Sequence, residues 1–436
     1  MLFNEFIIAN AMPKVYTGSK NVYFLALLHK ILKKERRFSM KLWHSVFLTP
    51  FLILCLIASN LFSYISVNTV SASSPSLTDT LQETSLYAKS ALLMDASNGR
   101  VLYEKNGYEK LPMASTTKIM TCIYTIEHGN LDDLVTISDH AARQPKVRLG
   151  VRQGEQYRLK DLLYALMLES YNDCAVAIAE HMSGSVEQFC YDISNKARDL
   201  GAYDTNFETP NGLDSDKHYT TSYDLALITK YAIQNETFLT IVKQQMYQFE
   251  EQTKKTSHFL SNKDAFLTQY NGAFGVKTGF TGNAGYCFVG AAKREEKTMI
   301  SVVLASGWPP NKTWKWSDTK KLMNYGFEHF SFQEIGTDHL NLPSIPVNNG
   351  QKNSVILYTD AKKETLLLSP SETFDIKIQL PDTLDAPIIK DMPLGSITYY
   401  LNGTEFRCYS IYAKHSVLKI DYRYCFYKVI KYWLSF

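Results

Sequence analysis

The order of helix-like and strand-like stretches limits the possible folds of this 436-residue chain more than any other feature of its sequence. Two apolar-rich stretches flank the turn residues 97–99 and predict a β-hairpin. From residue 115 to about residue 234, apolar residues recur at spacings of three and four, which is typical of helices. Strand-like runs then occupy residues 274–306, and a helix-like stretch follows at 316–330. Strands, then helices, then strands and a helix predict an α+β domain over residues 86–331.

A second domain is predicted from the change of pattern after this region. Over residues 332–422, short strand-like runs alternate with Pro, Asn, Asp and Gly turns, which predicts a small all-β domain. This second domain contains no obvious catalytic cluster in its sequence. Ahead of the α+β domain, residues 73–85 are polar and predict a linker.

The first 72 residues predict export of the protein and are left out of the predicted fold. A basic cluster at residues 34–41 precedes an apolar run at 46–58, and small residues follow at 70–72, a combination typical of a secretory signal peptide. The apolar run is short for a membrane span, and an uncleaved N-terminal anchor is the alternative. Because Met40 is followed by Lys41 at the head of this pattern, we expect translation to begin at Met40.

Residues 423–436 predict a tail that associates with a membrane. Lys428 and Lys431 are three residues apart and share one face of a helix, while aromatic and aliphatic residues cover the rest. The segment is too short to cross a bilayer, but a short basic helix rich in aromatic residues is suited to a membrane interface. Together with the export signal, it predicts attachment to the outer face of the cell membrane. The alternative is a final helix docked on the protein's own core.

The composition excludes some partners and cofactors. The formal net charge of +3 is near balance, so there is no electrostatic reason to expect nucleic acid as a partner. The seven cysteines are scattered, and neither C-x-x-C nor H-E-x-x-H occurs, so we predict no metal site and no other cofactor. We expect the cysteines to be buried free thiols, with a Cys174–Cys190 disulfide left open.

Chemistry is first suggested by Ser115 and Lys118, which stand where a proline-led loop turns into an apolar run. A serine hydroxyl is a weak nucleophile until a base takes its proton. If Ser115 begins a helix, Lys118 lies one turn further on and on nearly the same face. A lysine can act as the base when burial, another cation or a helix N-terminus lowers its pKa. The spacing alone is weak, because it recurs at Ser317 and Lys320, and a helix cap with a solvated lysine is the alternative.

Two further motifs favour a catalytic serine. Ser170 and Asn172 stand at a break between helix-like stretches, where they would project into a cleft as a proton relay and a substrate hydrogen-bond partner. The stretch Lys277–Gly279 falls within a predicted strand and offers a cation, a hydroxyl and a residue without a side chain, against which a substrate backbone can lie. Lys277 would also help to keep Lys118 neutral. A capping loop and an exposed edge strand are the structural alternatives.

Taken together, Ser-x-x-Lys, Ser-x-Asn and Lys-Thr-Gly resemble the motif set of penicillin-binding proteins and serine β-lactamases. Residues 93–106, 113–121 and 275–292 are most similar to one branch, the D-alanyl-D-alanine carboxypeptidases among the low-molecular-mass penicillin-binding proteins. The resemblance covers about residues 86–331, and the order of β domain and tail extends it. It implies a transpeptidase-like α+β fold, an antiparallel sheet with a helical cluster, followed by the small β domain.

The resemblance implies a serine peptidase that removes the terminal D-alanine from peptidoglycan stem pentapeptides through an acyl-enzyme. β-Lactams would acylate the same serine. The oxyanion hole would be formed by main-chain N–H groups of the serine and of the residue after Lys-Thr-Gly. The implied catalytic residues are Ser115, Lys118, Ser170 and Asn172, and the implied substrate-binding residues are Lys277, Thr278, Gly279 and Phe280.

Alternatives to the carboxypeptidase are a D,D-endopeptidase or a β-lactamase of the same fold, and a penicillin-binding sensor or scaffold without turnover. The second domain and the amphipathic tail favour the carboxypeptidase. Two departures from the family pattern are visible. Phe280 and Gly282 stand where some relatives have histidine and aspartate, which bears on deacylation and pocket polarity, and residues 209–213 replace a more usual Asn-Pro opening, with a mild effect expected.

Overall fold

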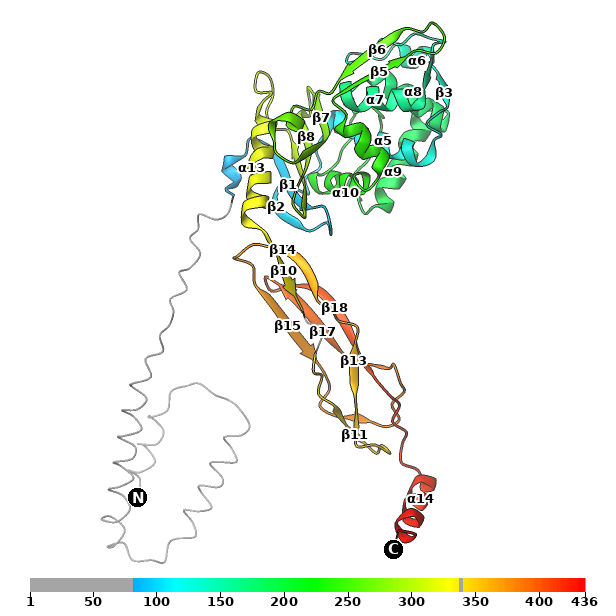
Figure 1. The fold of residues 1–436 in the computed structure, drawn as a ribbon, viewed down its shortest axis with the longest axis vertical. Helices are drawn as coiled ribbons and strands as arrows, with labels where there is room; N and C mark the ends of the chain where they lie inside the picture. The colour runs from blue at the N-terminus through cyan, green and yellow to red at the C-terminus, as the bar shows by residue number, and fades with distance from the viewer. Residues whose placement is uncertain (1–80, 337–339, 436) are drawn as a thin grey trace, which may run out of the picture. The chain divides into compact units, whose positions relative to one another are not determined.

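The structure, a computed structural model, describes residues 81–336 and 340–435 (Figure 1). The predicted leader, residues 1–72, and most of the predicted linker, 73–85, lie outside the described residues. The described end of that linker forms a 3-10 turn, η1 (Glu83–Ser85).

A five-stranded antiparallel sheet forms the centre of the first domain, in the order β2-β1-β9-β8-β7. The predicted hairpin around residues 97–99 is confirmed as its first two strands, and the predicted meander over 274–306 as the other three. β7 lies at one edge of this sheet. The strands are β1 (Ser90–Asp95), β2 (Val101–Lys105), β7 (Ala273–Thr281), β8 (Gly285–Arg294) and β9 (Lys297–Leu304).

Helices cover both faces of the sheet, as the alternation of buried residues along β1 shows. Leu92 and Met94 belong to the hydrophobic cluster that the larger group of helices shares. Ala91 and Leu93, which point the other way, belong to a second cluster with Leu322 of α13. Because both faces are buried, all six residues of β1 are buried and its four central residues are apolar without alternation.

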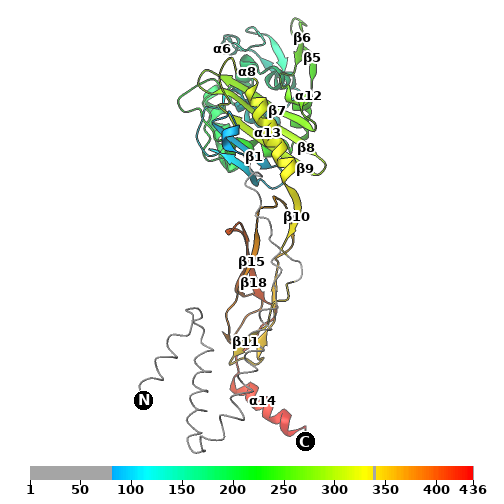
Figure 2. The same ribbon diagram turned by 90° about the vertical axis from the view of Figure 1, so that its left-hand side faces the viewer.

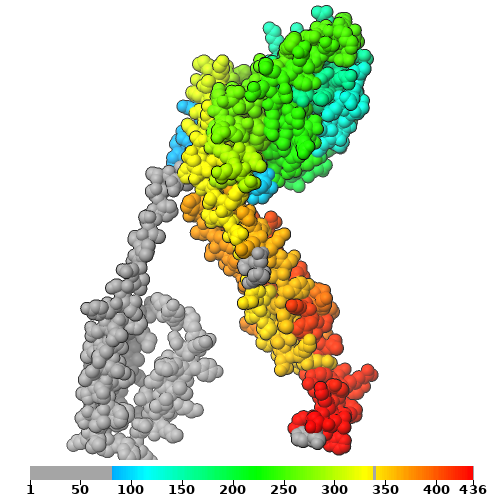
Figure 3. Space-filling model, viewed as in Figure 1, coloured from blue at the N-terminus to red at the C-terminus, as the bar shows by residue number. Residues whose placement is uncertain are grey.

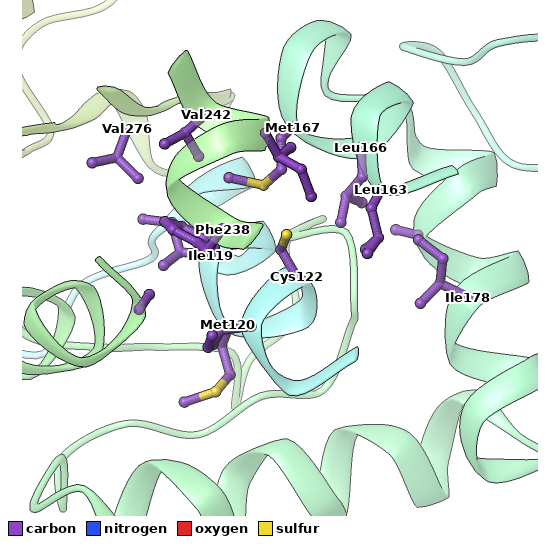
Figure 4. Close-up of a cluster of buried hydrophobic side chains, with 14 of the residues drawn as sticks. Ile119, Met120, Cys122, Leu163, Leu166, Met167, Ile178, Phe238, Val242 and Val276 are labelled. Atoms are coloured by element: carbon purple, nitrogen blue, oxygen red, sulfur yellow. The ribbon is translucent and has the colours of Figure 1, made fainter. Parts of the chain in front are cut away.

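The larger group of helices follows the predicted periodicity. Figure 4 shows its interior, where Ile119 and Cys122 of α5 lie among side chains such as Leu163, Ile178 and Phe238. The helical elements of the domain are the 3-10 turn η2 (Ala114–Thr117), α5 (Lys118–His128), α6 (Asp139–Ala142), α7 (Leu159–Tyr164), the π-helix η3 (Ala165–Glu169), α8 (Asn172–Ser183), α9 (Val186–Asp199), α10 (Ser222–Ala232), α11 (Glu236–Lys243), α12 (Phe266–Gln269) and α13 (Trp314–His329).

Helix α13 lies across the opposite face of the sheet, close against β8 and β9 (Figure 2). Its Gly326 permits this approach, because a Cβ at that position would come 2.7 Å from Leu93 Cδ2 and would also clash with Met299. Residues far apart in sequence therefore meet, and the blue and yellow segments lie side by side in Figure 3. The ring of Tyr87 stacks on Trp314 with centroids 4.1 Å apart.

Two small antiparallel ladders of this domain were not predicted. They are β3 (Leu134–Thr136) with β4 (Gln156–Arg158), and β5 (Met246–Glu250) with β6 (Ser257–Ser261). Each of these four strands buries a single residue, so the sequence carries too little apolar alternation to reveal them.

The second domain is all β up to its last strand, which confirms the predicted fold class. Its first strand begins at Ser331, and its core is a separate cluster that includes Tyr399 and Ile411. The strands form ladders of two, three and four members: β10 (Ser331–Ile335) with β14 (Glu364–Leu368); β12 (Ser354–Val355), β11 (Ile345–Asn348) and β16 (Leu384–Asp385); and β13 (Leu357–Thr359), β18 (Thr404–Ala413), β17 (Pro393–Leu401) and β15 (Phe374–Gln379).

The predicted C-terminal helix is present as α14 (Tyr422–Trp433), capped by the Asp421 side chain, which accepts from Tyr424 N. None of its residues is buried against the described part of the chain, so the alternative of a helix docked on the protein's own core is wrong for the described residues. Within residues 81–336 and 340–435, no helix combines the length and hydropathy that a bilayer span requires.

The cysteines of the described residues are all free, so the Cys174–Cys190 disulfide does not form. Cys122, Cys174, Cys190 and Cys287 are buried, as expected. Cys408 and Cys425 are exposed, contrary to the expectation of burial, because β18 and α14 turn them towards solvent.

Candidate active site

Ser115 lies in η2, immediately ahead of the helix that Lys118 begins. The two residues are one turn apart, and Lys118 Nζ lies within hydrogen-bond distance of Ser115 Oγ, at 2.9 Å. Ser115 is partly exposed, whereas Lys118 has no exposed surface. The serine is therefore accessible from solvent and the lysine is not. The alternative of a helix cap with a solvated lysine is wrong.

The amine of Lys118 has two further hydrogen-bond partners, both oxygens. It donates to Asn172 Oδ1 at 3.0 Å and to the main-chain carbonyl of Asn211 at 2.5 Å. Burial lowers the pKa of Lys118 well below its usual value, and the positive charge of Lys277 lowers it further. The predicted effect of Lys277 therefore has the expected direction, but burial is the larger cause.

The predicted break at residues 170–172 positions Asn172. The π-helix η3 ends at Glu169, the next residue, Ser170, has a left-handed φ of 66°, and α8 begins at Asn172. Asn172 is held on its other side as well, because its side chain donates to Pro145 O and its main-chain N–H to Val147 O. Ser170 is partly exposed, and its hydroxyl makes no hydrogen bond with any described residue. Asn172 is thus hydrogen-bonded directly to Lys118, whereas Ser170 is not.

The strand β7 carries Lys277, Thr278 and Gly279 alongside η2. A Cβ on Gly279 would lie 3.1 Å from both Ser115 N and Ala114 Cβ, closer than side chains usually pack. The glycine therefore allows the strand to pass close to the start of the serine's helix. Phe280 follows with 43% of its surface exposed, and its ring lies 4.6 Å from that of Tyr286 on β8.

Lys277 is buried, with 2% of its surface exposed, and Nζ donates to Thr278 O at 3.2 Å. Burial lowers the pKa of Lys277 to about 7; the carboxylate of Asp264 opposes this effect and the Lys315 ammonium adds to it. Burial also raises the pKa of Asp264 to about 7. One oxygen of that carboxylate accepts from Phe266 N, while Oδ2 has no partner among the described residues. A small set of buried titratable groups therefore stands behind the strand.

Sequence reasoning missed the loop that closes the site behind the lysine. Asn211 acts through its main-chain carbonyl, which receives Lys118 Nζ, and Gly212 packs so tightly that a Cβ would clash with Ala114 O. His218 is buried and lies 2.8 Å from Thr117 Oγ1. A contact through a main-chain carbonyl leaves no signal in the residue type. The glycine within residues 209–213 was the available sign of close packing in this loop. This segment departs from the family pattern, and the sequence predicts only a mild effect of that departure.

Substitution of Lys277 by methionine should change how stability depends on pH. The unfolded chain holds the Lys277 proton to about pH 10, whereas the folded protein releases it near pH 7 because its pKa is about 7. Between these values the unfolded state binds more protons, so this group adds stability as pH rises, by at most about 1.4 kcal/mol per pH unit. We expect urea unfolding to show that the free energy of unfolding of wild type rises relative to that of Lys277→Met as pH increases over this range.

The exposed Lys293→Met is the matched control for that experiment, and its difference from wild type should not change with pH. A constant difference between wild type and Lys277→Met would contradict the lowered pKa of Lys277.

The sequence and the fold have counterparts among known proteins. The peptidase S11 model, described as D-alanyl-D-alanine carboxypeptidase, matches residues 77–307, and the model described as penicillin-binding protein 5, C-terminal domain, matches residues 327–419. D-alanyl-D-alanine carboxypeptidase DacF of Bacillus subtilis is 30% identical over 77% of this chain and 87% of its own length.

Solved structures show the same likeness. The crystal structure of penicillin-binding protein 5 from Haemophilus influenzae superposes with a TM-score of 0.62 and 26% identity, covering 78% of this chain and all of that one. A serine-to-alanine mutant of the Streptomyces K15 DD-transpeptidase gives a TM-score of 0.53 and 34% identity, covering 56% of this chain and 98% of that one.

The resemblance predicted from the sequence is therefore confirmed for both domains. The match to the first family model spans more than half of the chain, and the Bacillus relative is aligned over most of both proteins. The chain belongs to the peptidase S11 family of low-molecular-mass penicillin-binding proteins, and it is a serine D-alanyl-D-alanine carboxypeptidase that acts on peptidoglycan.

Proposed function

We propose that Ser115 is the nucleophile of this carboxypeptidase and that neutral Lys118 is its base. The observation that carries the proposal is the set of three oxygens around Lys118 Nζ. Two of them, the amide oxygen of Asn172 and the main-chain carbonyl of Asn211, can only accept hydrogen bonds. A neutral amine has two N–H groups and one lone pair, so donation to these oxygens leaves the lone pair for the Ser115 hydroxyl.

Acylation follows from this arrangement. The Ser115 proton passes to Lys118 Nζ while Oγ forms a bond to the carbonyl carbon of the penultimate D-alanine. The negative charge moves to the carbonyl oxygen, where the main-chain N–H groups of Ser115 and Phe280 receive it. The closeness of β7 to Ser115 N at Gly279 supports this pairing of donors. The C–N bond then breaks and the amine of the terminal D-alanine leaves.

The leaving amine takes a proton that starts on Lys118 and is relayed by Ser170. The Ser170 hydroxyl is available for this role, because it makes no hydrogen bond with the described residues. Asn172 holds the substrate amide as well as the lysine. Deacylation repeats the sequence with water: water gives its proton to Lys118, its oxygen bonds to the ester carbon, and the departing Ser115 Oγ regains the proton.

Lys277 and Thr278 would bind the terminal carboxylate of the stem pentapeptide. In the free protein, the pKa of Lys277 is lowered to about 7 by burial. An incoming carboxylate reverses this effect, since an opposite charge favours the ammonium form. Recognition of a C-terminal carboxylate restricts the reaction to the end of a peptide. A β-lactam also carries a carboxylate beside a reactive amide, so it would acylate Ser115 in the same place.

Replacement of the nucleophile provides the test. With a diacyl-Lys-D-Ala-D-Ala peptide, we expect wild type to release D-alanine and Ser115→Ala to lose about 10³-fold or more of that rate, as removal of a nucleophile does in other serine peptidases. Ser317→Ala, from the second Ser-x-x-Lys in the described chain, should behave as wild type.

Two results would contradict these assignments. Release of D-alanine by a well-folded Ser115→Ala would exclude Ser115 as the nucleophile. Stable labelling of Ser115 by a fluorescent penicillin, without release of D-alanine, would support a sensor or scaffold in place of a peptidase that turns over.

We also propose that the protein is exported and that α14 attaches it to the outer face of the cell membrane. None of the helix's residues is buried, and all of them except Tyr424, whose hydroxyl donates to Gln351 O, are exposed. Arg423, Lys428 and Lys431 would meet anionic headgroups, while the apolar residues enter the interface. The exposed large apolar residues of this segment are Tyr422, Phe426, Tyr427, Val429, Ile430, Tyr432, Trp433 and Leu434.

Binding of the full chain to anionic phosphatidylglycerol vesicles tests the attachment. Each large apolar side chain contributes about 1.5–3 kcal/mol when fully buried, so Trp433→Ser combined with Leu434→Ser should weaken binding by about tenfold or more. Tyr203→Ser, which removes an equally exposed aromatic residue from the first domain, is the control and should bind as wild type. Equal binding by all three proteins would exclude the helix as the attachment.

A further inference from the structure

The peptide that joins Ala114 to Ser115 is held in an unusual conformation. Ala114 has a φ of 49°, in the left-handed region that residues other than glycine rarely adopt. Its carbonyl is enclosed by Gly212, where a Cβ would clash with it. Such a conformation persists only when the surroundings fix it.

One of the groups that fix it is the hydroxyl of Thr117. This side chain has no exposed surface, and Oγ1 donates to Ala114 O at 2.9 Å. Oγ1 also lies 2.8 Å from His218 Nε2. A hydroxyl has one proton, and the carbonyl oxygen can only accept it. The hydroxyl therefore accepts from His218, whose Nε2 carries a proton.

The other ring nitrogen of His218 faces donors only. The main-chain N–H groups of Glu208 and Thr209 point at Nδ1, at 3.0 and 3.4 Å. Nδ1 must therefore be unprotonated, and the ring is neutral with its single proton on Nε2. The burial of His218 is consistent with a neutral ring, since the residue is 2% exposed and burial lowers the pKa of His218 to about 4.

These bonds form one directed chain that ends at the nucleophile. Main-chain N–H groups donate to His218, His218 donates to Thr117, and Thr117 donates to the carbonyl of Ala114. The carbonyl of Ala114 and the N–H of Ser115 belong to the same planar peptide. Fixing the direction of the oxygen therefore fixes the direction of the Ser115 N–H.

We propose that His218 is a positioning residue of the carboxypeptidase, which acts through Thr117 to orient the Ala114–Ser115 peptide so that the Ser115 N–H faces the developing oxyanion. The inference rests on the role proposed above for Ser115. The oxyanion forms only during the reaction and is absent from the bound substrate. Loss of this chain of hydrogen bonds therefore slows acylation and leaves substrate binding nearly unchanged.

The test compares two pairs of variants in the full chain. Loss of a whole oxyanion donor costs about 10² to 10³ in rate, and a loosened donor should cost about tenfold to a hundredfold. We expect this loss in the acylation rate by a fluorescent penicillin, and in kcat for D-alanine release with little change in KM, for Thr117→Val and His218→Leu. Thr117→Ser and His218→Gln keep the donors and should restore most of the rate.

A double-mutant cycle measures whether the losses in acylation rate from the two substitutions are additive, which distinguishes a positioning role from a merely structural one. Because Thr117 and His218 act in one chain, the double variant should acylate no more slowly than the slower single variant. Thr229→Val is the matched control, since this buried threonine also donates back to a helix carbonyl, Leu225 O at 2.7 Å, but lies in α10. Thermal unfolding of every variant separates rate effects from lost stability.

Unchanged acylation in folded Thr117→Val or His218→Leu, or fully additive losses in the double variant, would overturn the inference. If Thr117→Val does not fold, the comparison of His218→Gln with His218→Leu decides in its place. Penicillin labelling of wild type at a residue other than Ser115 would overturn the proposed nucleophile and this inference together. Normal labelling of Ser115 with no effect of the variants would overturn the positioning role alone.

Discussion

The buried amine of Lys118 is the group on which the rest of the site depends. An ammonium ion without a carboxylate partner is expensive to enclose, so burial itself favours the neutral form that a base requires. Two carbonyl-type oxygens, from Asn172 and Asn211, accept hydrogen bonds from Lys118 Nζ, and in the proposed mechanism this leaves its lone pair for the serine. These oxygens come from different parts of the chain, so the helices and the loop must assemble before the lysine has its partners.

Close backbone packing supports the second requirement of the proposed mechanism, a fixed place for the developing negative charge. Gly279 on β7 and Gly212 on the loop both approach the peptide that carries Ser115 N–H; a Cβ at Gly212 would clash with Ala114 O, and one at Gly279 would pack unusually tightly. The edge position of β7 leaves a side of the strand free for a substrate backbone. The sheet, buried on both faces, gives this strand a rigid base, and in the proposed mechanism an incoming carboxylate stabilises the ammonium form of Lys277.

The sequence predicted those parts of the site that act through side-chain type and local spacing. Ser115 and Lys118 are a helical turn apart, Asn172 follows a break in helical periodicity, and Lys277 lies in a strand-like run, so each had a local signal. Asn211 had none, because its main-chain carbonyl is the acting group. His218 is joined to Thr117 only by the tertiary fold, and its neutral state follows from two main-chain donors that no pattern reveals. In the fold, apolar periodicity predicted the main helices and the sheet, whereas the exposed ladders β3–β4 and β5–β6 bury too little for such a signal.

The protonation state of Lys118 in the free protein is the most direct measure of this account. Nuclear magnetic resonance of protein labelled with ¹³C at lysine Cε, with the signal of Lys118 assigned from its loss in Lys118→Arg, would follow its titration. We expect Lys118 to titrate well below its ordinary pKa and to be neutral where the enzyme is active. An ammonium form that persists through the active pH range would contradict the assignment of Lys118 as the base.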